Sequence, residues 1–413
     1  MSKWEEKQLG ELIRIKHGFA FSGDYIIDSD NGVVLVTPGN FKIGGGFKQS
    51  GKKFYSGEFP KEYVLKKKSL IVTMTDLSKN ADTLGYAAYV PDDEKIYLHN
   101  QRIGLVSIIS DEIIEKFLYW LLRTPWYQRR IANTSSGTNV KHTSPDRIYK
   151  YKFMLPEKGQ QERIADILSA YDDLIEANNR RIELLEQAAQ DLYKEWFVRF
   201  RFPGHEKAKF ENGLPEGWEL KKIGDIAHVK SGYAFKSEWW IDEGVPVVKI
   251  KDIQGNTIDF GDLSHVSEEH AEIAKQFYIV EGDLLIAMTG ATIGKLALVP
   301  YSERQMVVNQ RVGKFFLNEN PTEKVAFLYM TLQQNWVQEL IVMIAGSNAA
   351  QPNISPFDIE KIKVIYNKDL VDEYNRKSTT FIKQILQLLR QNKNLVAQRD
   401  LLLPRLMSGK LEV

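Results

Sequence analysis

The chain has 413 residues, a length that predicts two or three domains, each large enough to bury its own core. Its hydrophobic fraction of 43% and charged fraction of 26% are ordinary for a globular protein and exclude extended disorder. The absence of cysteine excludes disulfides, thiol catalysis and Cys-ligated zinc. No apolar run approaches the roughly 20 residues of a membrane-spanning helix, and the first residues lack a secretion signal, so we expect a cytoplasmic protein with no membrane contact.

The net charge of +1 conceals a difference between two parts of the chain. Residues 1–156 carry 23 basic and 17 acidic side chains, whereas residues 218–366 carry 14 and 19. A basic face that contacts a polyanion is therefore expected in the first part. The second part should repel phosphate unless its positive side chains gather on one face or a partner supplies the missing charge.

The chain contains an internal repeat. Trp4–Phe21 aligns with Trp218–Phe235 with eight identities in 18 positions, where ordinary composition gives about one. The motifs that recur in the same order are Met74-Thr75, Asn100-Gln101-Arg102 and Ser144-Pro145 in the first copy, and Met288-Thr289, Asn309-Gln310-Arg311 and Ser355-Pro356 in the second. We therefore predict two copies of one domain, over residues 1–156 and 218–366.

Within each copy, strand-like and helix-like segments alternate, which predicts a mixed α/β (α+β) domain. Strand-like runs are residues 32–36 and 69–74 in the first copy and 283–288 in the second. Helical patterns cover residues 111–122 and 322–344.

Each copy is followed by a long helical stretch, over residues 157–200 and 367–413, with a linker over residues 201–217 between the first helix and the second copy. The apolar positions alternate in spacings of three and four, which is typical of a coiled-coil seam. The residues expected at the helix-pair interface are Ile164, Leu168, Tyr171, Ile175, Asn178, Ile182, Leu185, Leu192, Phe381, Ile385, Leu388, Asn392 and Leu402.

The seam holds one asparagine in each helix, Asn178 and Asn392, at matching places. A buried asparagine is unfavourable unless its amide is paired, and its best attested use is to fix helix register. We expect the two helices to lie antiparallel and to separate the two domains, related by a pseudo-twofold axis. The alternative is that each long helix packs separately on its own domain.

No catalytic motif is complete in this chain. The segment Gly290–Lys295 looks like a phosphate-binding loop, but it has three residues between its glycines where four are needed, and no Ser or Thr follows the lysine. His265 and His270 show no metalloprotease pattern, and we expect no metal site. The Asn-Pro-Pro-aromatic motif of amino-methyltransferases is also missing. We therefore expect no catalytic residue and no cofactor in the chain itself.

Two segments carry a family resemblance. Residues 160–204 read QQERIADILSAYDDLIEANNRRIELLEQAAQDLYKEWFVRFRFPG, and residues 398–413 read QRDLLLPRLMSGKLEV. Together with the duplicated domains, they resemble the specificity (S) subunit of type I restriction-modification systems over nearly the whole chain.

The resemblance implies that each copy is a target recognition domain contacting one half of a split double-stranded DNA sequence, while the paired helices fix the gap. It also implies that two methyltransferase (M) subunits dock on the chain and that motor-nuclease restriction (R) subunits join the full complex. S-adenosylmethionine, ATP and Mg are expected on these partner subunits.

Because the copies are similar but not identical, the two half-sites should differ, and base-reading residues should lie where the copies diverge. Segments that both copies share, such as Met74-Thr75 and the two Asn-Gln-Arg triplets, are interpreted as scaffold. The DNA-binding candidates are Lys48, Lys52, Lys53, Lys79, Asn80, Asn139, Lys141 and His142 in the first domain and Thr292, Lys295, Asn348, Gln351 and Asn353 in the second. Of these, Lys48, Lys52 and Lys53 are expected to contact phosphate. The alternative for each single residue is an ordinary solvated loop side chain.

Two other functions are weighed against DNA recognition. A protein-interaction scaffold, with two binding modules on a coiled coil and no DNA binding, stays open because heptads alone do not separate it from a DNA reader. A self-contained methyltransferase or nuclease is disfavoured by the missing motifs.

Overall fold

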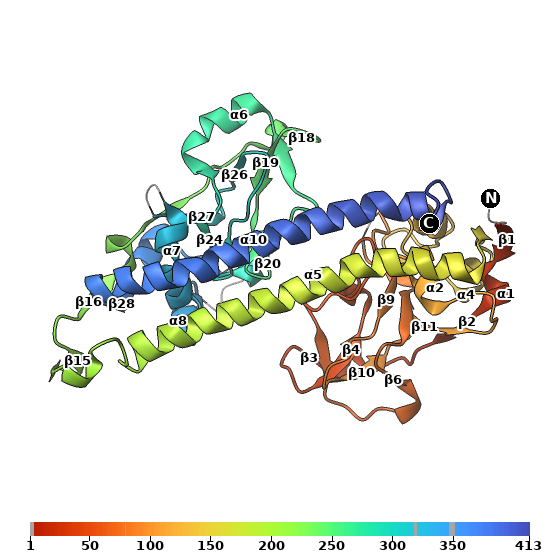
Figure 1. Cartoon of the computed structure of the whole chain (residues 1–413), viewed down its shortest axis with the longest axis horizontal. Coiled ribbons are helices and arrows are strands. Elements are labelled where there is room, and N and C mark those ends of the chain that lie inside the picture. The colour runs from red at the N-terminus through yellow and green to blue at the C-terminus, as the bar shows by residue number, and fades with distance from the viewer. Residues whose placement is uncertain (1–3, 79, 318–319, 347–351) are drawn as a thin grey trace. The chain divides into compact units, whose positions relative to one another are not determined.

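A computed structural model of the chain describes residues 4–78, 80–317, 320–346 and 352–413 (Figure 1). The chain forms two compact units. Unit 1 comprises Met1–Leu174 and Leu395–Val413, and unit 2 comprises Ile175–Asn394. Each unit contains one copy of the repeat together with part of both long helices.

Unit 1 is built on two sheets. The five-stranded sheet has the order β3 (Ile26–Ile27), β5 (Lys53–Tyr55), β4 (Val33–Val36), β10 (Ile96–His99) and β6 (Val64–Leu65). The four-stranded sheet has the order β2 (Ile13–His17), β11 (Ile103–Ile108), β7 (Leu70–Thr73) and β9 (Ala87–Tyr89). Smaller elements are the pairs β1 (Glu5–Gln8) with β13 (Lys152–Leu155) and β8 (Thr75–Asp76) with β12 (Lys141–His142), and helices α1 (Leu9–Leu12), α2 (Glu115–Leu121), α3 (Pro125–Asn133) and α4 (Pro145–Tyr149).

Unit 2 repeats the two main sheets with the same strand order. Its five-stranded sheet has the order β18 (Trp240–Ile241), β22 (Ser264–Val266), β19 (Val245–Val248), β26 (Met306–Val308) and β23 (Tyr278–Ile279). Its four-stranded sheet has the order β17 (His228–Ser231), β27 (Val312–Phe316), β24 (Leu284–Ala287) and β25 (Leu296–Leu298). The remaining elements are β14 (Phe210–Glu211) with β15 (Leu214–Pro215), β16 (Glu219–Lys222) with β28 (Lys363–Tyr366), β20 (Ile253–Gln254) with β21 (Thr257–Ile258), and α6 (Glu268–Ile273), α7 (Pro321–Leu332), α8 (Asn335–Ile344) and α9 (Pro356–Glu360). The prediction of two similar α/β domains is confirmed.

One strand pair in each five-stranded sheet is parallel, β4 with β10 and β19 with β26. These central strands consist of near-continuous apolar residues, because both of their faces are covered. Parallel strands end at the same edge of a sheet. In unit 2 the residues after Val248 and Val308 therefore lie side by side, although 60 positions separate them in the sequence.

The helical pattern predicted over residues 322–344 is two helices, α7 and α8. Gln334 interrupts them with an extended backbone, ψ 136°. Its side-chain amide donates to the Met330 carbonyl at 2.9 Å and to Gln190 Oε1 on the long helix at 2.8 Å. The break is therefore stabilised by contacts that a local helical pattern does not record.

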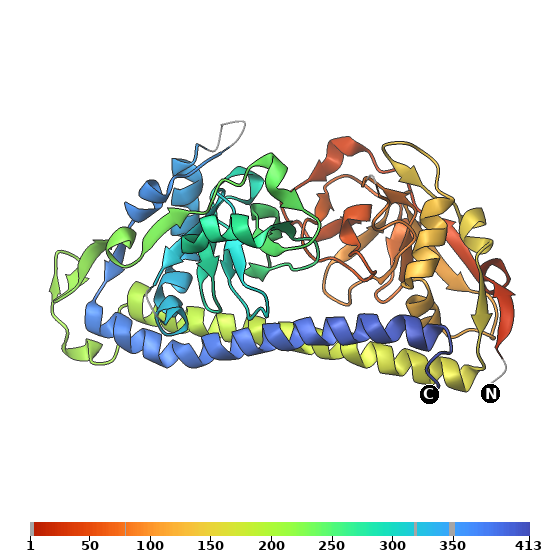
Figure 2. The same cartoon turned by 90° about the horizontal axis from the view of Figure 1, so that it is seen from above.

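The two long helices are α5 (Lys158–Tyr193), extended by one π-helical turn over Lys194–Val198, and α10 (Lys368–Met407). In unit 2 they run antiparallel, because Asn178 of α5 contacts Asn392 while Ala189 contacts Tyr374. Figure 2 shows that the helices lie along one side of the sheets within each unit.

The helix segments also belong to the cores of the domains. In unit 1, Ile164 and Leu168 of α5 share a core with Leu403 and Leu406 of α10 and with the buried Trp120 of α2. In unit 2, Ile385 is buried and lies in a core that also includes the half-buried Ile182, Leu185, Leu192 and Phe381. Tyr171, Ile175 and Leu402 are half-buried, and Leu388 is buried. The helices therefore pack both on each other and on the domains.

Asn178 and Asn392 lie opposite each other in unit 2. Asn178 is 2% exposed, and its Nδ2 donates to Asn392 Oδ1 at 2.9 Å. Asn392 Nδ2 in turn donates to Asn179 Oδ1 at 2.8 Å. The buried amide is thus paired, which is the condition under which such a residue specifies one register.

We expect Asn178→Leu to destabilise unit 2 by about 1–3 kcal/mol, because the side-chain oxygen of Asn392 loses the amide that donates to it. The double variant Asn178→Leu/Asn392→Leu should recover most of this loss while permitting other helix registers. Urea unfolding checks both expectations. Asn394→Leu, at an exposed position of α10, is the control and should have little effect. An unchanged midpoint for Asn178→Leu would contradict the role given to this pair.

Candidate nucleic-acid interface

In unit 1 two of the predicted site residues lie on a short strand pair. β8 and β12 pair so that Thr75 faces His142 and Asp76 faces Lys141. The His142 side chain is exposed, and its Nδ1 lies 3.1 Å from Thr75 Oγ1. The Lys141 amine donates to the Gly137 carbonyl at 3.0 Å. The strand pair thus presents an imidazole and an ammonium group at one edge.

Asp76 organises the loop that follows β8. Its carboxylate accepts hydrogen bonds from the backbone N–H of Ser78 at 2.6 Å and from Thr83 Oγ1 at 2.7 Å. Burial raises the pKa of Asp76, but these hydrogen bonds outweigh burial and lower it. Asn80 is exposed on this loop. The predicted Lys79 lies outside the described residues.

Asn139 is exposed in the hairpin that precedes β12. The hairpin depends on Gly137, which has φ +96°, and a Cβ there would lie 2.0 Å from the Val140 carbonyl oxygen. Only glycine allows the chain to turn this tightly at that point. The turn brings Asn139 into the same loop group as Lys141 and His142.

Unit 2 builds the same arrangement from different side chains. Thr289 bridges Asn353, and the Gly290 N–H donates to the Pro352 carbonyl at 2.9 Å. The Lys295 N–H donates to the Thr292 carbonyl at 3.0 Å, which places these two residues on the adjacent turn. Asn353 and Lys295 are exposed and Thr292 is half-buried. Asn348 and Gln351 lie outside the described residues.

A glutamine anchors this loop group in both units. Gln128 of α3 donates to the Ala81 carbonyl at 2.6 Å, and Gln338 of α8 donates to the Gly294 carbonyl at 3.2 Å. The scaffold is therefore shared. Both copies have a threonine here, Thr75 or Thr289, and the residue opposite it is His142 in unit 1 and Asn353 in unit 2. We call these two places the reading positions.

The lysines predicted to contact phosphate in unit 1 lie on β5 or in the segment before it, and β5 belongs to a different sheet from β8 and β12. Lys53 is on β5 and forms an ion pair with Asp28 at 2.6 Å. The Lys52 amine lies 3.4 Å from Tyr97 Oη, and burial lowers its pKa. Lys48 is half-buried. Part of this positive charge is therefore neutralised within the chain.

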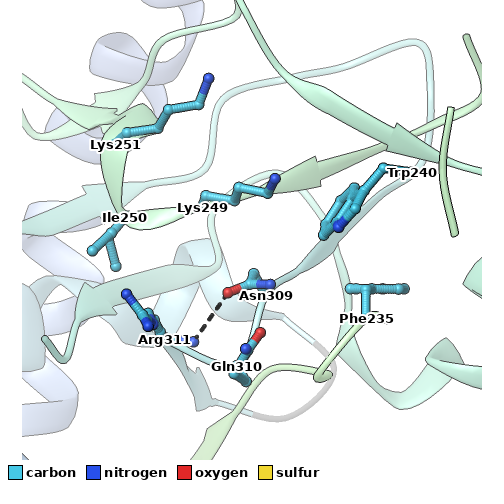
Figure 3. Close-up of a pocket in the computed structure, with 8 residues that line it drawn as sticks. All are labelled: Phe235, Trp240, Lys249, Ile250, Lys251, Asn309, Gln310 and Arg311. Atoms are coloured by element: carbon cyan, nitrogen blue, oxygen red, sulfur yellow. Dashed lines mark hydrogen bonds between the residues drawn. The ribbon is translucent and has the colours of Figure 1, made fainter. Parts of the chain in front are cut away.

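Unit 2 has a hollow of about 310 Å³ where the parallel strands β19 and β26 end (Figure 3). It is lined by Phe235, Trp240, Lys249, Ile250, Lys251, Asn309, Gln310 and Arg311. Three of these side chains are basic, although the acidic residues outnumber the basic ones over residues 218–366. Three of the 14 basic residues of this domain thus lie around one hollow, which favours an anion there.

The basic side chains of the hollow have different surroundings. The Lys249 amine lies 3.6 Å from the centre of the Trp240 ring and donates to Ser264 Oγ at 2.8 Å. Burial lowers the pKa of Lys249, and the charge of Lys251 adds to this effect. Lys251 forms an ion pair with Asp262 at 2.7 Å. The Arg311 side chain is exposed and forms no ion pair with any described residue.

The sequence pattern did not reveal this hollow. Lys249 and Lys251 stand at the start of a segment rich in acidic residues, and the Asn309-Gln310-Arg311 triplet was interpreted as scaffold because both copies contain it. Their proximity comes from the parallel pairing of β19 with β26, which is a non-local contact. Basic residues directly after two apolar strands are the signal that points to it.

Within the described ranges, no group of three or more His, Asp or Glu side chains is placed to hold a metal ion. Nor does any described helix combine the length and the apolar composition that crossing a membrane requires.

Comparisons with known proteins agree on one family. A family model described as type I restriction modification DNA specificity domain matches residues 1–187 and 215–394. The chain is 25% identical over 288 residues to the type I restriction enzyme MjaVIII specificity subunit of Methanocaldococcus jannaschii, covering 68% of this chain and 67% of that protein. It is 24% identical over 394 residues to the HindI specificity subunit of Haemophilus influenzae, covering 79% and 84%. The solved structure of a type I restriction-modification S subunit from M. genitalium shares the fold, with a TM-score of 0.52 and 20% identity over 98% of this chain and 96% of that one.

Proposed function

The chain belongs to the type I restriction modification DNA specificity family, and we propose that its two domains read the two halves of one interrupted double-stranded DNA sequence. Its relatives are specificity subunits, which direct an enzyme to a DNA sequence and do not themselves catalyse the reaction. What we propose beyond the family is how this chain divides its DNA target between the two units.

The observation that carries the proposal is the matched pair of reading positions. Backbone pairing opposite the shared threonine presents His142 on the β8–β12 pair of unit 1 and Asn353 at an isolated bridge in unit 2, and both side chains are exposed. An asparagine amide can bond an adenine edge in pairs, whereas an imidazole offers one donor and one acceptor. Two similar scaffolds with different reading side chains fit two half-sites of different sequence.

We also propose that the chain acts in the cytoplasm with two methyltransferase (M) subunits and, through them, with motor-nuclease restriction (R) subunits. Its relatives are named as subunits of restriction enzymes, which supports a multi-subunit complex. S-adenosylmethionine, ATP and Mg belong to these partners in the proposal, since adenine methylation and ATP-dependent DNA cleavage are chemistry that the chain's own reading positions do not supply.

Methylation mapping tests the proposal. The chain is produced together with its methyltransferase partner in a host without other adenine methylation, and the modified adenines are mapped by single-molecule sequencing. We expect one interrupted motif in which both half-sites are required. A contiguous motif, or a motif that persists when this chain is omitted, would count against the proposal, and an interaction scaffold would leave the DNA unmarked.

A further inference from the structure

In the Asn-Gln-Arg triplet that both copies share, the asparagine side chain bonds within the turn, whereas the glutamine and arginine bond only through their backbone groups. Asn309 is 8% exposed, and its Oδ1 accepts from the Arg311 N–H at 3.4 Å. Asn100 makes the equivalent bond to the Arg102 N–H at 3.0 Å. The asparagine therefore shapes the turn in both units.

The glutamine and arginine of each triplet have no such structural role. The side chains of Gln101, Arg102, Gln310 and Arg311 are exposed and make no hydrogen bond or ion pair with any described residue. Both domains nevertheless carry the same two residues, while the reading positions beside them differ. An exposed pair that two diverged domains share, and that the fold does not need, points to an external group that both domains meet.

We propose that the Gln-Arg pair binds the sugar-phosphate backbone of DNA in both units. This inference rests on the proposed function. Two half-sites of different sequence present different base edges, but their phosphodiester groups are the same. A guanidinium group binds phosphate through two parallel hydrogen bonds, and an adjacent amide can donate a third.

The position of the turn supports this assignment. The Arg311 carbonyl accepts from the Met288 N–H at 3.0 Å, directly before Thr289, which faces the reading position of unit 2. The Arg102 carbonyl accepts from the Met74 N–H at 2.9 Å, directly before Thr75. In both units a hydrogen bond thus joins the Gln-Arg turn to the segment that supports the reading position. A contact between this turn and a DNA phosphate would therefore orient the base edges toward the reading position.

The hollow of unit 2 adds the charge that an anion requires. Gln310 and Arg311 line it together with Lys249 and Lys251, and Figure 3 shows the turn that carries them beside the lysine-bearing segment. At the position of Lys249, unit 1 has Thr37, the residue that follows its own parallel strand β4. We therefore expect Arg311 to act with lysines, and Arg102 to act with fewer charges near it.

The salt dependence of DNA binding tests the inference. The full-length chain and its Arg102→Gln, Arg311→Gln and double variants are titrated with a short fluorescent duplex of arbitrary sequence between about 50 and 200 mM salt. Each phosphate contact that is lost lowers the slope of log K against log salt by about 0.9, so the double variant should lose about twice as much. Thermal unfolding should be unchanged, because both arginines are exposed.

Arg304→Gln is the matched control. Arg304 is an exposed arginine of unit 2 that precedes β26, whereas Arg311 follows the same strand, so it removes the same charge at the opposite end. Its slope should equal that of the unmodified chain. An equal loss for Arg304→Gln would show a general charge effect and overturn the inference.

Three further outcomes separate this inference from the function on which it rests. If the unmodified chain binds the duplex and the Arg102→Gln and Arg311→Gln variants keep its slope, the backbone contact is wrong while DNA recognition stands. The same holds if these variants instead lose their methyltransferase partner in pull-down, since the pair would then contact protein. If the unmodified chain binds no duplex, alone or with that partner, both the function and the inference fail.

Discussion

Replacing Asp172 by asparagine is expected to destabilise unit 1 by about 3–5 kcal/mol. Asp172 of α5 lies between two arginines, with Oδ2 at 2.6 Å from Arg123 Nη1 and Oδ1 bonded to Arg399 of α10. The Arg123 side chain is only 3% exposed, and its Nε also donates to the Gly44 carbonyl at 2.8 Å. Without the carboxylate, the buried Arg123 guanidinium would lose its ion-pair partner, and Arg399 beside it would keep only its bond to the exposed Asp400.

The loss should depend on pH in a definite direction. Burial raises the pKa of Asp172, but the charges and hydrogen bonds of Arg123 and Arg399 outweigh burial and hold it below its usual range. A carboxyl group whose pKa is lower in the folded state stabilises the fold when ionised, and this contribution disappears as the pH falls through the folded pKa. The difference between the original chain and Asp172→Asn should therefore be constant above about pH 5 and shrink in more acidic solution.

Urea unfolding at several pH values measures this difference, and hydrogen exchange of α2 assigns it to unit 1. Asp173→Asn is the control, because Asp173 is the exposed neighbour on the same helix. Equal unfolding midpoints for the two variants would show that the ion cluster does not hold the helix pair to the first domain.

The ion cluster of Asp172, Arg123 and Arg399 is a feature that sequence periodicity does not predict. Heptad spacing predicted the long helices, because it is a local pattern. The identities between the two copies predicted two similar domains, because they form a repeat. Asp172 is found in neither, since its partners lie 49 and 227 positions away in the chain. The attachment of the helices to the domains depends on such distant pairs.

The same distinction applies to the candidate interface. Divergence between the copies indicated His142 and Asn353, and the structure places both opposite a threonine that the copies share. The hollow at Lys249 and Arg311 could not be found in this way, because it forms only when β19 and β26 pair. Within the Asn-Gln-Arg triplet, which the sequence predicts as scaffold, the asparagine side chain bonds within the turn, whereas the glutamine and arginine take part through their backbone groups.

Exchanging the two reading side chains is expected to alter each half-site separately. His142→Asn gives unit 1 the side chain that unit 2 presents at Asn353, in both units opposite the shared threonine. A good paired contact to a base discriminates by about 1–3 kcal/mol, which corresponds to about 5- to 150-fold in affinity between the favoured and disfavoured base. We expect His142→Asn to change the preference in one half-site and Asn353→His to change it in the other.

Selection from duplexes randomised at both half-sites, using the chain assembled with its methyltransferase partner, measures the preferences. His265→Asn makes the same substitution on β22, away from either reading position in the sheet order, and should change neither half-site. The double exchange should combine both changes additively if the domains read independently. If His142→Asn alone shifts the preference in both half-sites, independent reading is contradicted. If it shifts neither, His142 does not contact a base, and the neighbouring loop residues Asn80 and Asn139 carry the specificity of unit 1.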